Sequence, residues 1–220
     1  MDMPPKPKFT KEAVAAIALA IIKEDGLAAL TARELGKRLG TSASPIFTVF
    51  QSMDEVKLAA RKLALDEFKA YISDYREYSP AFKRIGMMMV SYGLHEPELF
   101  KLLFMQEHGE KHDFRSTLND LGGVAEVCIA LIQRDYAMNP EEATLVMEQM
   151  WTQAFGLGAM CAMGVCDFTE EEISRRLGIV FISLAMAIKS GKLEMFDRIP
   201  VKGGDGAFNG RAVGDLPQLP

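Results

Sequence analysis

Hydrophobic residues recur at intervals of three and four along most of this chain, which is the spacing of one face of an α-helix. Residues 10–25 form the first such segment, and Asp25-Gly26 closes it. No stretch has the strict alternation that a half-buried β-strand requires. The pattern therefore predicts an all-α protein of about nine helices.

Residues 30–56 contain three helix starts within a short distance. The first is Thr31 with Glu34 three positions later, a capping box in which each side chain satisfies a backbone N–H at the helix entrance. Gly40 supplies the left-handed residue that commonly ends a helix. These signals predict a helix of about eight residues.

A second short helix is expected directly after Gly40. Ser42 or Ser44 caps it, and Pro45 is tolerated because the first turn has no intrahelical N–H to lose. Ile46 and Phe50, four positions apart, form its buried side. This helix has barely two turns.

The third start is Ser52 with Glu55, which repeats the capping box and opens a longer helix that reaches about Ser73. The apolar positions expected along it are Val56, Leu58, Ala59, Leu63 and Ala64. Two short helices joined by a tight turn and braced by longer ones are typical of a helix-turn-helix that presents a recognition helix to DNA.

Further helix signals follow residue 75. We expect helices from Ser79-Pro80, with Ser79 as cap, through Tyr92; from 98 to 105; from 118 or 121 to 136; from the Asn139 capping box through Leu157; and from Thr169 with Glu172 to Gly191. Residues 108–117 are expected to be a loop, and residues 201–220 a mobile tail rich in glycine and proline.

Several short segments of the N-terminal part share a family pattern. They are Glu24-Asp25-Gly26, Leu30-Thr31-Ala32-Arg33, Gly40, Ser42, Ile46-Phe47, Phe50 and Ser52-Met53-Asp54-Glu55. With these, residues 9–66 resemble the DNA-binding domain of the TetR family of transcriptional regulators. The resemblance implies a helix-turn-helix domain, expected over residues 1–73, and a helical ligand-binding and dimerisation domain over 74–200; the tail over 201–220 follows from its composition.

The same resemblance implies which residues contact DNA. It places Arg33 at a guanine edge, where a bidentate contact suits its side chain. The complete set of expected DNA-binding residues is Thr31, Arg33, Ser42, Ala43, Ser44, Pro45, Phe47, Thr48 and Lys57. Three positions depart from the family pattern, since Phe47, Val49 and Met53 stand where tyrosine, histidine or tyrosine, and lysine are usual.

The net charge differs between the N-terminal part of the chain and the remainder. Residues 1–62 hold ten Lys plus Arg against seven Asp plus Glu, or +3, whereas the remainder holds fifteen against twenty-three, or −8, in agreement with the net charge of −5. A basic N-terminal part suits a partner with phosphates, although +3 is also within ordinary scatter. We expect Lys6, Lys8 and Lys11 to form a basic arm.

A length of 220 residues with 49% hydrophobic content allows a sizeable core. No apolar run reaches the roughly 20 residues that cross a bilayer, and the N-terminus lacks signal-peptide features, so a cytoplasmic location is expected. The cysteines Cys128, Cys161 and Cys166 are odd in number, which favours free thiols over a disulfide framework.

The C-terminal part carries a weaker resemblance in residues 95–104 and 150–160. They are similar to the ligand-binding half of a TetR subgroup marked by Trp-His-Gly, with Phe155-Gly156 at the His-Gly positions. This resemblance implies a homodimer formed through the last two long helices and an internal small-molecule cavity. The alternative to the dimer interface is a fully intramolecular core.

Methionine and aromatic residues are concentrated in the same part of the chain, which suits an adaptable apolar pocket, although such a stripe is equally an ordinary core. The expected ligand-pocket residues are Met88, Tyr92, Phe104, His108, Met147, Met150, Trp151 and Phe155. The expected effector is a small, largely apolar molecule.

No enzymatic motif is present in the sequence. The run His108 to His112 places its carboxylate one position too late for a zinc-protease motif, and a solvated loop explains it better. We expect no metal, no cofactor and no catalytic residue. The predicted function is a homodimeric, ligand-responsive repressor that binds a pseudo-palindromic DNA operator. The alternative is a helical small-molecule- or partner-binding protein that has lost specific DNA binding.

Overall fold

The computed structural model describes residues 9–106, 114–119 and 122–192, apart from the side chains of Arg115 and Asn119. Within these residues all regular structure is helical, with nine α-helices and three short 3-10 helices and no strand, as the periodicity predicts. The chain up to Leu184 forms one unit, and a second begins at Ala185. The following description concerns the first unit.

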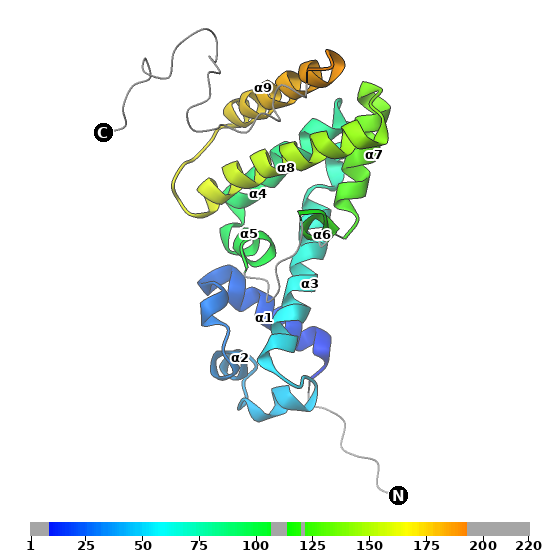
Figure 1. Cartoon of the computed structure of the whole chain (residues 1–220). Helices are drawn as coiled ribbons and strands as arrows, with labels where there is room; N and C mark the ends of the chain where they lie inside the picture. The colour runs from blue at the N-terminus through cyan, green and yellow to red at the C-terminus, as the bar shows by residue number, and fades with distance from the viewer. Residues whose placement is uncertain (1–8, 107–113, 120–121, 193–220) are drawn as a thin grey trace, which may run out of the picture. The chain divides into compact units, whose positions relative to one another are not determined.

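The head, residues 9–66, consists of α1 (Lys11–Asp25), a 3-10 turn η1 (Leu27–Ala29), α2 (Ala32–Arg38), a 3-10 helix η2 (Ser44–Thr48) and the first part of α3 (Met53–Tyr71). Helices α1 and α3 pack directly on each other (Figure 1). Small side chains allow this close approach, because Ala15 and Ala18 of α1 and Ala60 and Ala64 of α3 are all buried.

Three hydroxyl side chains begin the head helices. Thr10, Thr31 and Ser52 each accept a hydrogen bond from the backbone N–H three positions later, at 3.2, 3.1 and 3.3 Å. The predicted helix starts at Thr31 and Ser52 are therefore confirmed. Their glutamates do not complete the reciprocal bond of a capping box. Glu34 instead accepts hydrogen bonds from Lys37 and Arg38, and Glu55 from the N–H of Gln51.

The second short helix differs from the prediction. Ser44–Thr48 is a 3-10 helix without a side-chain cap, so the expected cap at Ser42 or Ser44 is wrong. Bonds between residues three apart hold this segment, including the Ile46 N–H to the Ala43 carbonyl. A 3-10 turn needs fewer residues per turn than an α-helix, which suits so short a segment.

The buried face of α3 also differs in part. Val56, Ala60, Ala64 and Phe68 are buried at intervals of four, whereas Leu58, expected on the apolar side, is 66% exposed. The helix ends at Tyr71, two residues before the predicted end. The prediction for Leu58 is wrong because apolar residues occur on more than one side of α3. Packing against α1 decides which of these sides is buried.

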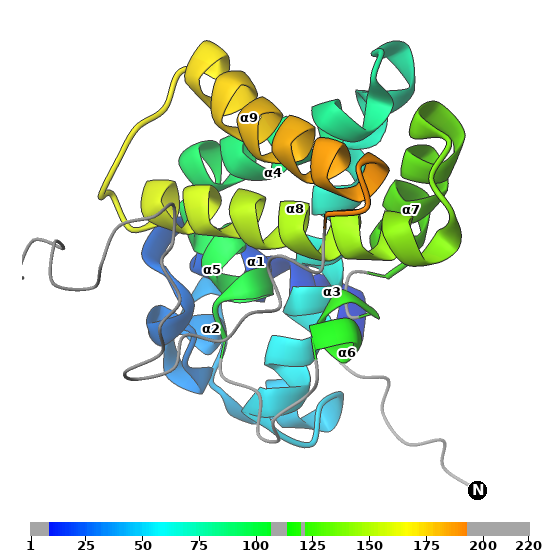
Figure 2. The same cartoon turned by 45° about the horizontal axis from the view of Figure 1, so that its top comes forward.

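The body is built from the end of α3 and the helices that follow it. They are η3 (Ser73–Glu77), α4 (Ala81–His95), α5 (Pro97–Phe104), α6 (Phe114–Asn119), α7 (Val124–Tyr136), α8 (Pro140–Ala162) and α9 (Glu170–Lys189). Helix α8 packs on α4, α7 and α5, and α5 also contacts α1 and α3 of the head (Figures 1 and 2). Helix α5 thus lies between α8 and the head.

Two body helices begin as predicted. Asn139 and Glu142 form a complete capping box at α8, with both hydrogen bonds at 2.9 Å. Thr169 and Glu172 exchange the same pair of bonds at the start of α9. The methionine- and glycine-rich stretch after Leu157 does not end α8, which continues to Ala162.

Two body predictions are wrong. Pro80 itself occupies the cap position of α4 and no side-chain hydrogen bond caps this helix, so Ser79 is not the cap. Residues 114–117 belong to helix α6 and not to a loop. The rest of the predicted loop, 108–113, and the predicted tail, 201–220, lie outside the described residues.

Glycines set the closest helix approach in the body. A Cβ atom at Gly93 of α4 would overlap the carbonyl group of Gly158 on α8, and one at Gly158 would lie 2.6 Å from the Phe100 ring of α5. The C-terminal parts of α4 and α8 therefore pack tightly against each other and against α5.

Candidate DNA-binding surface and ligand cavity

The turn between α2 and η2 is held in a defined geometry. Gly40 has a φ of 65°, the Thr41 N–H donates to the Gly36 carbonyl at 2.9 Å, and the Gly40 N–H donates to the Lys37 carbonyl at 3.1 Å. This is the Schellman arrangement of hydrogen bonds at a helix end. A Cβ atom at Gly36 would lie 3.0 Å from the backbone of Ser42. Gly36 therefore lets η2 approach α2 closely.

The residues expected to contact DNA lie on α2, η2, the turn between them and the start of α3. Thr31, Arg33, Ser42, Ser44, Phe47 and Thr48 are exposed, and Ala43, Pro45 and Lys57 are half-buried. The Thr31 hydroxyl caps α2, and the Thr48 hydroxyl donates to the Pro45 carbonyl at 2.6 Å. Phe47 is 45% exposed, so its ring is accessible to a partner.

Arg33 is the most available charged group of this surface. It makes no hydrogen bond or ion pair with any described residue, in contrast to Arg38, which bonds Glu24 at 2.7 Å and Asp25 at 3.1 Å. Hydrogen bonding by Arg38 also lowers the pKa of Glu34. Arg38 therefore joins α1 to α2, while Arg33 is free to bind an external partner.

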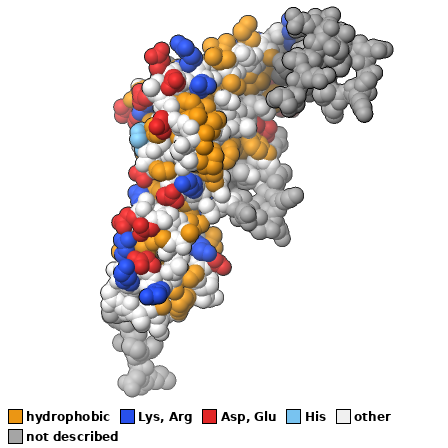
Figure 3. Space-filling view, turned by 90° about the vertical axis from the view of Figure 1, so that its left-hand side faces the viewer, with side chains coloured by type: hydrophobic (Ala, Val, Ile, Leu, Met, Phe, Trp, Pro, Cys, Tyr) orange, Lys and Arg blue, Asp and Glu red, His pale blue; other side chains and the backbone are white. Residues whose placement is uncertain are grey.

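Most other basic groups of the head are engaged with neighbours, Lys62 being an exception. Lys37 pairs with Glu34 and Lys57 with Asp54, at 3.3 and 3.1 Å, and basic and acidic side chains are interleaved on the face of the head in Figure 3. Exposed pairs of this kind contribute roughly 0 to 1 kcal/mol. A phosphate can therefore replace the carboxylate partner at little cost.

The body contains a partly open apolar cavity of about 290 Å³. Helices α4, α7, α8 and α9, together with the end of α3 and Pro80, form its wall. The lining residues are Phe68, Pro80, Phe82, Lys83, Ile85, Gly86, Met89, Cys128, Tyr136, Met147, Met150, Trp151, Ala154, Leu177, Gly178, Phe181 and Ile182. A volume near 300 Å³ is at the lower end of small-molecule sites.

The expected pocket residues are divided between the cavity wall and its surroundings. Met147, Met150 and Trp151 line the cavity. Phe104 and Phe155 do not line the cavity. Phe104 packs edge-on against the lining residue Trp151 at 5.6 Å between ring centroids, and Phe155 stacks on Phe100 at 6.2 Å. Met88 and Tyr92 also lie outside the lining, and His108 is outside the described residues.

Tyr92 lies behind Phe68, which itself lines the cavity. The two rings meet edge-on at 5.1 Å, and Tyr92 is 1% exposed. Its hydroxyl is the one fully buried side-chain polar atom without a hydrogen-bond partner among the described residues. Burial strongly raises the pKa of Tyr92, so the hydroxyl stays protonated at neutral pH. Tyr92 thus contacts a lining residue without lining the cavity itself.

Several lining residues were not among the predicted pocket residues. Phe82, Ile85 and Met89 on α4, and Leu177 and Phe181 on α9, belong to apolar helix stripes that the sequence makes visible. That periodicity identifies a buried face but not the empty space beside it. Lys83 and Tyr136 carry no sequence signal for this location.

The thiols and acids of the described residues offer no evident reactive centre. Burial raises the pKa of Cys128 to about 12, which keeps this cavity-lining thiol protonated. No group of three or more His, Cys, Asp or Glu that could hold a metal ion occurs in the described part of the chain. No helix in that part is long and apolar enough to cross a membrane.

No protein-family model and no curated protein matches the chain. Solved structures do match it. A Rhodococcus protein of unknown function aligns with a TM-score of 0.62 and 15% identity, over 84% of this chain and 98% of its own. A TetR variant from Acinetobacter baumannii, in complex with minocycline, aligns with a TM-score of 0.54 and 17% identity, over 84% of this chain and 99% of its own.

A third structure, a transcriptional regulator from Rhodococcus, aligns with a TM-score of 0.54 and 18% identity, over 82% of this chain and 96% of its own. These likenesses extend over head and body together. The described chain therefore has the fold of the TetR-family regulators.

Proposed function

We propose that this protein is a cytoplasmic, ligand-responsive transcriptional regulator, most simply a repressor, that binds DNA as a homodimer. The observation that carries the proposal is the course of α3. Its first turn follows η2 in the head, and Phe68 near its other end lines the cavity of the body. One helix thus joins the candidate DNA-binding surface to the candidate effector site.

Several features of the head support a role in DNA recognition. Arg33 is exposed and unpaired, and the small residues Ala43 and Ser44 begin the short helix that would enter the major groove. Thr31 and Ser42 would bind phosphates, Pro45 and Thr48 would face base edges, and Phe47 and Lys57 would flank them. Two such surfaces about 34 to 36 Å apart would reach successive major grooves of a pseudo-palindromic operator.

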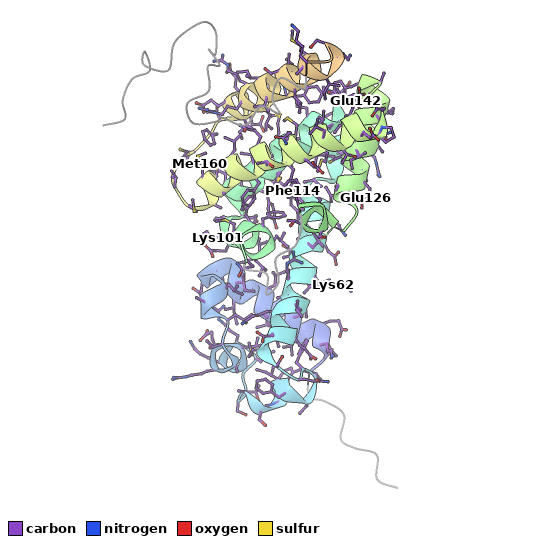
Figure 4. The ribbon with its side chains drawn as sticks, viewed as in Figure 1. Lys62, Lys101, Phe114, Glu126, Glu142 and Met160 are labelled. Carbon is purple, nitrogen blue, oxygen red and sulfur yellow. The ribbon has the colours of Figure 1, made fainter. Side chains whose placement is uncertain are left out.

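Dimerisation would use α8 and α9. Ile179 and Ile182 of α9 are 60% and 58% exposed. Met160 near the C-terminal end of α8 (Figure 4) and Met163 directly after this helix are 36% and 55% exposed. Isoleucine side chains this exposed favour burial against a partner. A second copy with the same two helices would cover them.

An effector in the cavity would act through Phe68 and α3. It can weaken DNA binding only if it binds one arrangement of the two heads more tightly than the other. The minocycline bound by the A. baumannii TetR variant is a precedent for a small-molecule ligand in this fold.

The alternative function is a helical small-molecule- or partner-binding protein without specific DNA binding. The observation that favours it is the pairing of Lys23, Lys37, Arg38 and Lys57 with carboxylates. Each ion pair reduces the positive charge that the head offers to phosphates.

Selection from a random pool of double-stranded DNA distinguishes the two functions. The full-length protein should recover a shared sequence with two related half-sites about one helical turn apart, or a multiple of it. Arg33→Ala should relax the preference at one base pair in each half-site. Recovery of unrelated sequences by a folded dimer would favour the alternative.

A further inference from the structure

The polar groups in the cavity wall are few, and all of them are hydrogen-bond donors. Lys83 is the only charged residue in the lining, and Tyr136 and Trp151 add a hydroxyl and an indole N–H. None of the three makes a hydrogen bond with another described residue. The lining contains no carboxylate, no side-chain amide and no serine or threonine.

The protonation states of the lining side chains also favour hydrogen-bond donors over negatively charged acceptors. Burial, and to a lesser extent the charge of Asp135, raises the pKa of Tyr136, so its hydroxyl is a donor at neutral pH. The Cys128 thiol also keeps its proton. No negative charge in the lining therefore competes for Lys83, which suits a ligand with a strong acceptor group.

Lys83 and Tyr136 belong to the same end of the cavity. Phe181 of α9 contacts Phe82, the neighbour of Lys83, at 6.1 Å between ring centroids, and contacts Tyr136 at 4.5 Å. The wall towards Met89 carries only apolar side chains of α4. Six residues separate Lys83 from Met89, which corresponds to a rise of about 9 Å along the helix.

We propose that the cavity binds a linear medium-chain carboxylate, with its carboxylate at Lys83 and Tyr136 and its alkyl chain directed towards Met89. A cavity of about 290 Å³ is at the lower end of the volumes of small-molecule sites, which suits a compact ligand. An eight-carbon carboxylate is such a ligand and matches the length of the apolar wall. The inference deepens the proposed function, because it names the chemical class of the effector.

The test measures binding to the full-length protein without DNA, with octanoate, 1-octanol and octylammonium as probes. Trp151 is the only tryptophan of the chain and lines the cavity, so its fluorescence and isothermal titration report binding together. Octanoate should bind at least about tenfold more tightly than 1-octanol, because a hydrogen bond to a charged group adds this much. Octylammonium should bind most weakly.

Substitutions of Lys83 test whether its ammonium group binds the carboxylate. Lys83→Met should weaken octanoate about tenfold or more and leave 1-octanol within about twofold, whereas Lys83→Arg should retain octanoate. Lys62→Met is the control, because Lys62 is exposed on α3 and outside the cavity (Figure 4). Tyr136→Phe should cause a smaller loss for octanoate. Thermal unfolding of each variant checks that it is folded.

Three results would overturn the proposal: equal affinity for octanoate and 1-octanol, tighter binding of octylammonium, or a Lys83→Met variant that loses both octanoate and 1-octanol to the same extent. Failure of all three probes to bind would overturn it as well. If octanoate binds through Lys83 but leaves DNA binding unchanged, the ligand class stands and the regulatory function fails. If the protein binds a specific operator but no carboxylate, only the ligand class fails.

Discussion

The head and the body of this protein bury their apolar residues in different ways. In the head, alanines of α1 and α3 and the glycine at position 36 bring backbones together, and hydroxyl caps define where each helix begins. In the body, aromatic and methionine side chains surround about 290 Å³ of empty space. The head is thus held in one fixed geometry, as the proposed recognition of DNA would require, whereas the body leaves room for side chains to adapt.

Helix α3 shows the contrast within a single element. Ala60 and Ala64 pack it against the head, whereas four positions later Phe68 faces Phe104, Tyr92 and the cavity. A ligand that displaces Phe68 would therefore move α3, and the close contact of α3 with α1 would carry this movement into the head.

The largest expected effect comes from adding the same volume to both regions. Ala60→Leu has no space in the head and should destabilise the protein by about 1 to 3 kcal/mol. Ala154→Leu extends into the cavity, so it should change the free energy of unfolding by less than about 1 kcal/mol while blocking ligand binding. Denaturant unfolding measures both. Equal losses would contradict the difference in packing.

The next effect concerns the head surface alone. Arg33→Ala should cost about 1 to 3 kcal/mol of affinity for the operator and reduce discrimination at one base pair, with unfolding unchanged. Lys62→Ala is the matched control, since Lys62 is also exposed and unpaired but lies outside the predicted contact residues. If Arg33→Ala weakens specific and random DNA equally, the side chain contacts phosphate and not a base.

Loss of a helix cap should act equally on stability in the two regions but unequally on function. Ser52→Ala in the head and Asn139→Ala in the body each remove one capping acceptor and should cost about 1 kcal/mol. For a chain of this size that lowers the melting temperature by roughly 2 to 4 °C. Only Ser52→Ala, next to η2, should also weaken operator binding; equal weakening by both would point to stability alone.

The smallest effect is expected at Lys57. Lys57→Ala breaks an exposed ion pair with Asp54, so stability should change by less than about 1 kcal/mol. If Lys57 binds phosphate, the slope of log affinity against log salt should fall by about 1. An unchanged slope would remove Lys57 from the predicted contacts, and Asp54→Ala, which frees the same lysine, should affect affinity in the opposite direction.

The sequence predicts best where structure is local. The caps at Thr31, Ser52, Asn139 and Thr169 follow from hydrogen bonds between residues three apart, and the structure contains each of them. The helical fold follows from the same periodicity.

Features that depend on contacts between residues distant in the sequence could not be predicted in this way. Leu58 is as apolar as a core residue but lies on the solvent side of α3. Ser79 is a residue type that often caps a helix, but Pro80 occupies the cap position of α4. The cavity is a property of several helices at once. Composition indicated Met147, Met150 and Trp151, whereas Lys83 and Tyr136 become part of the wall only when α4, α7 and α9 assemble.

The central claim is that the head reads DNA sequence. The most direct measurement is binding of the purified full-length protein to the DNA that flanks its own coding region, against random DNA of equal length, at two salt concentrations. We expect tighter binding to the flanking DNA at both concentrations and a linear loss of log affinity with log salt. No preference for either DNA at either salt concentration, from a folded dimer, would contradict the proposed function.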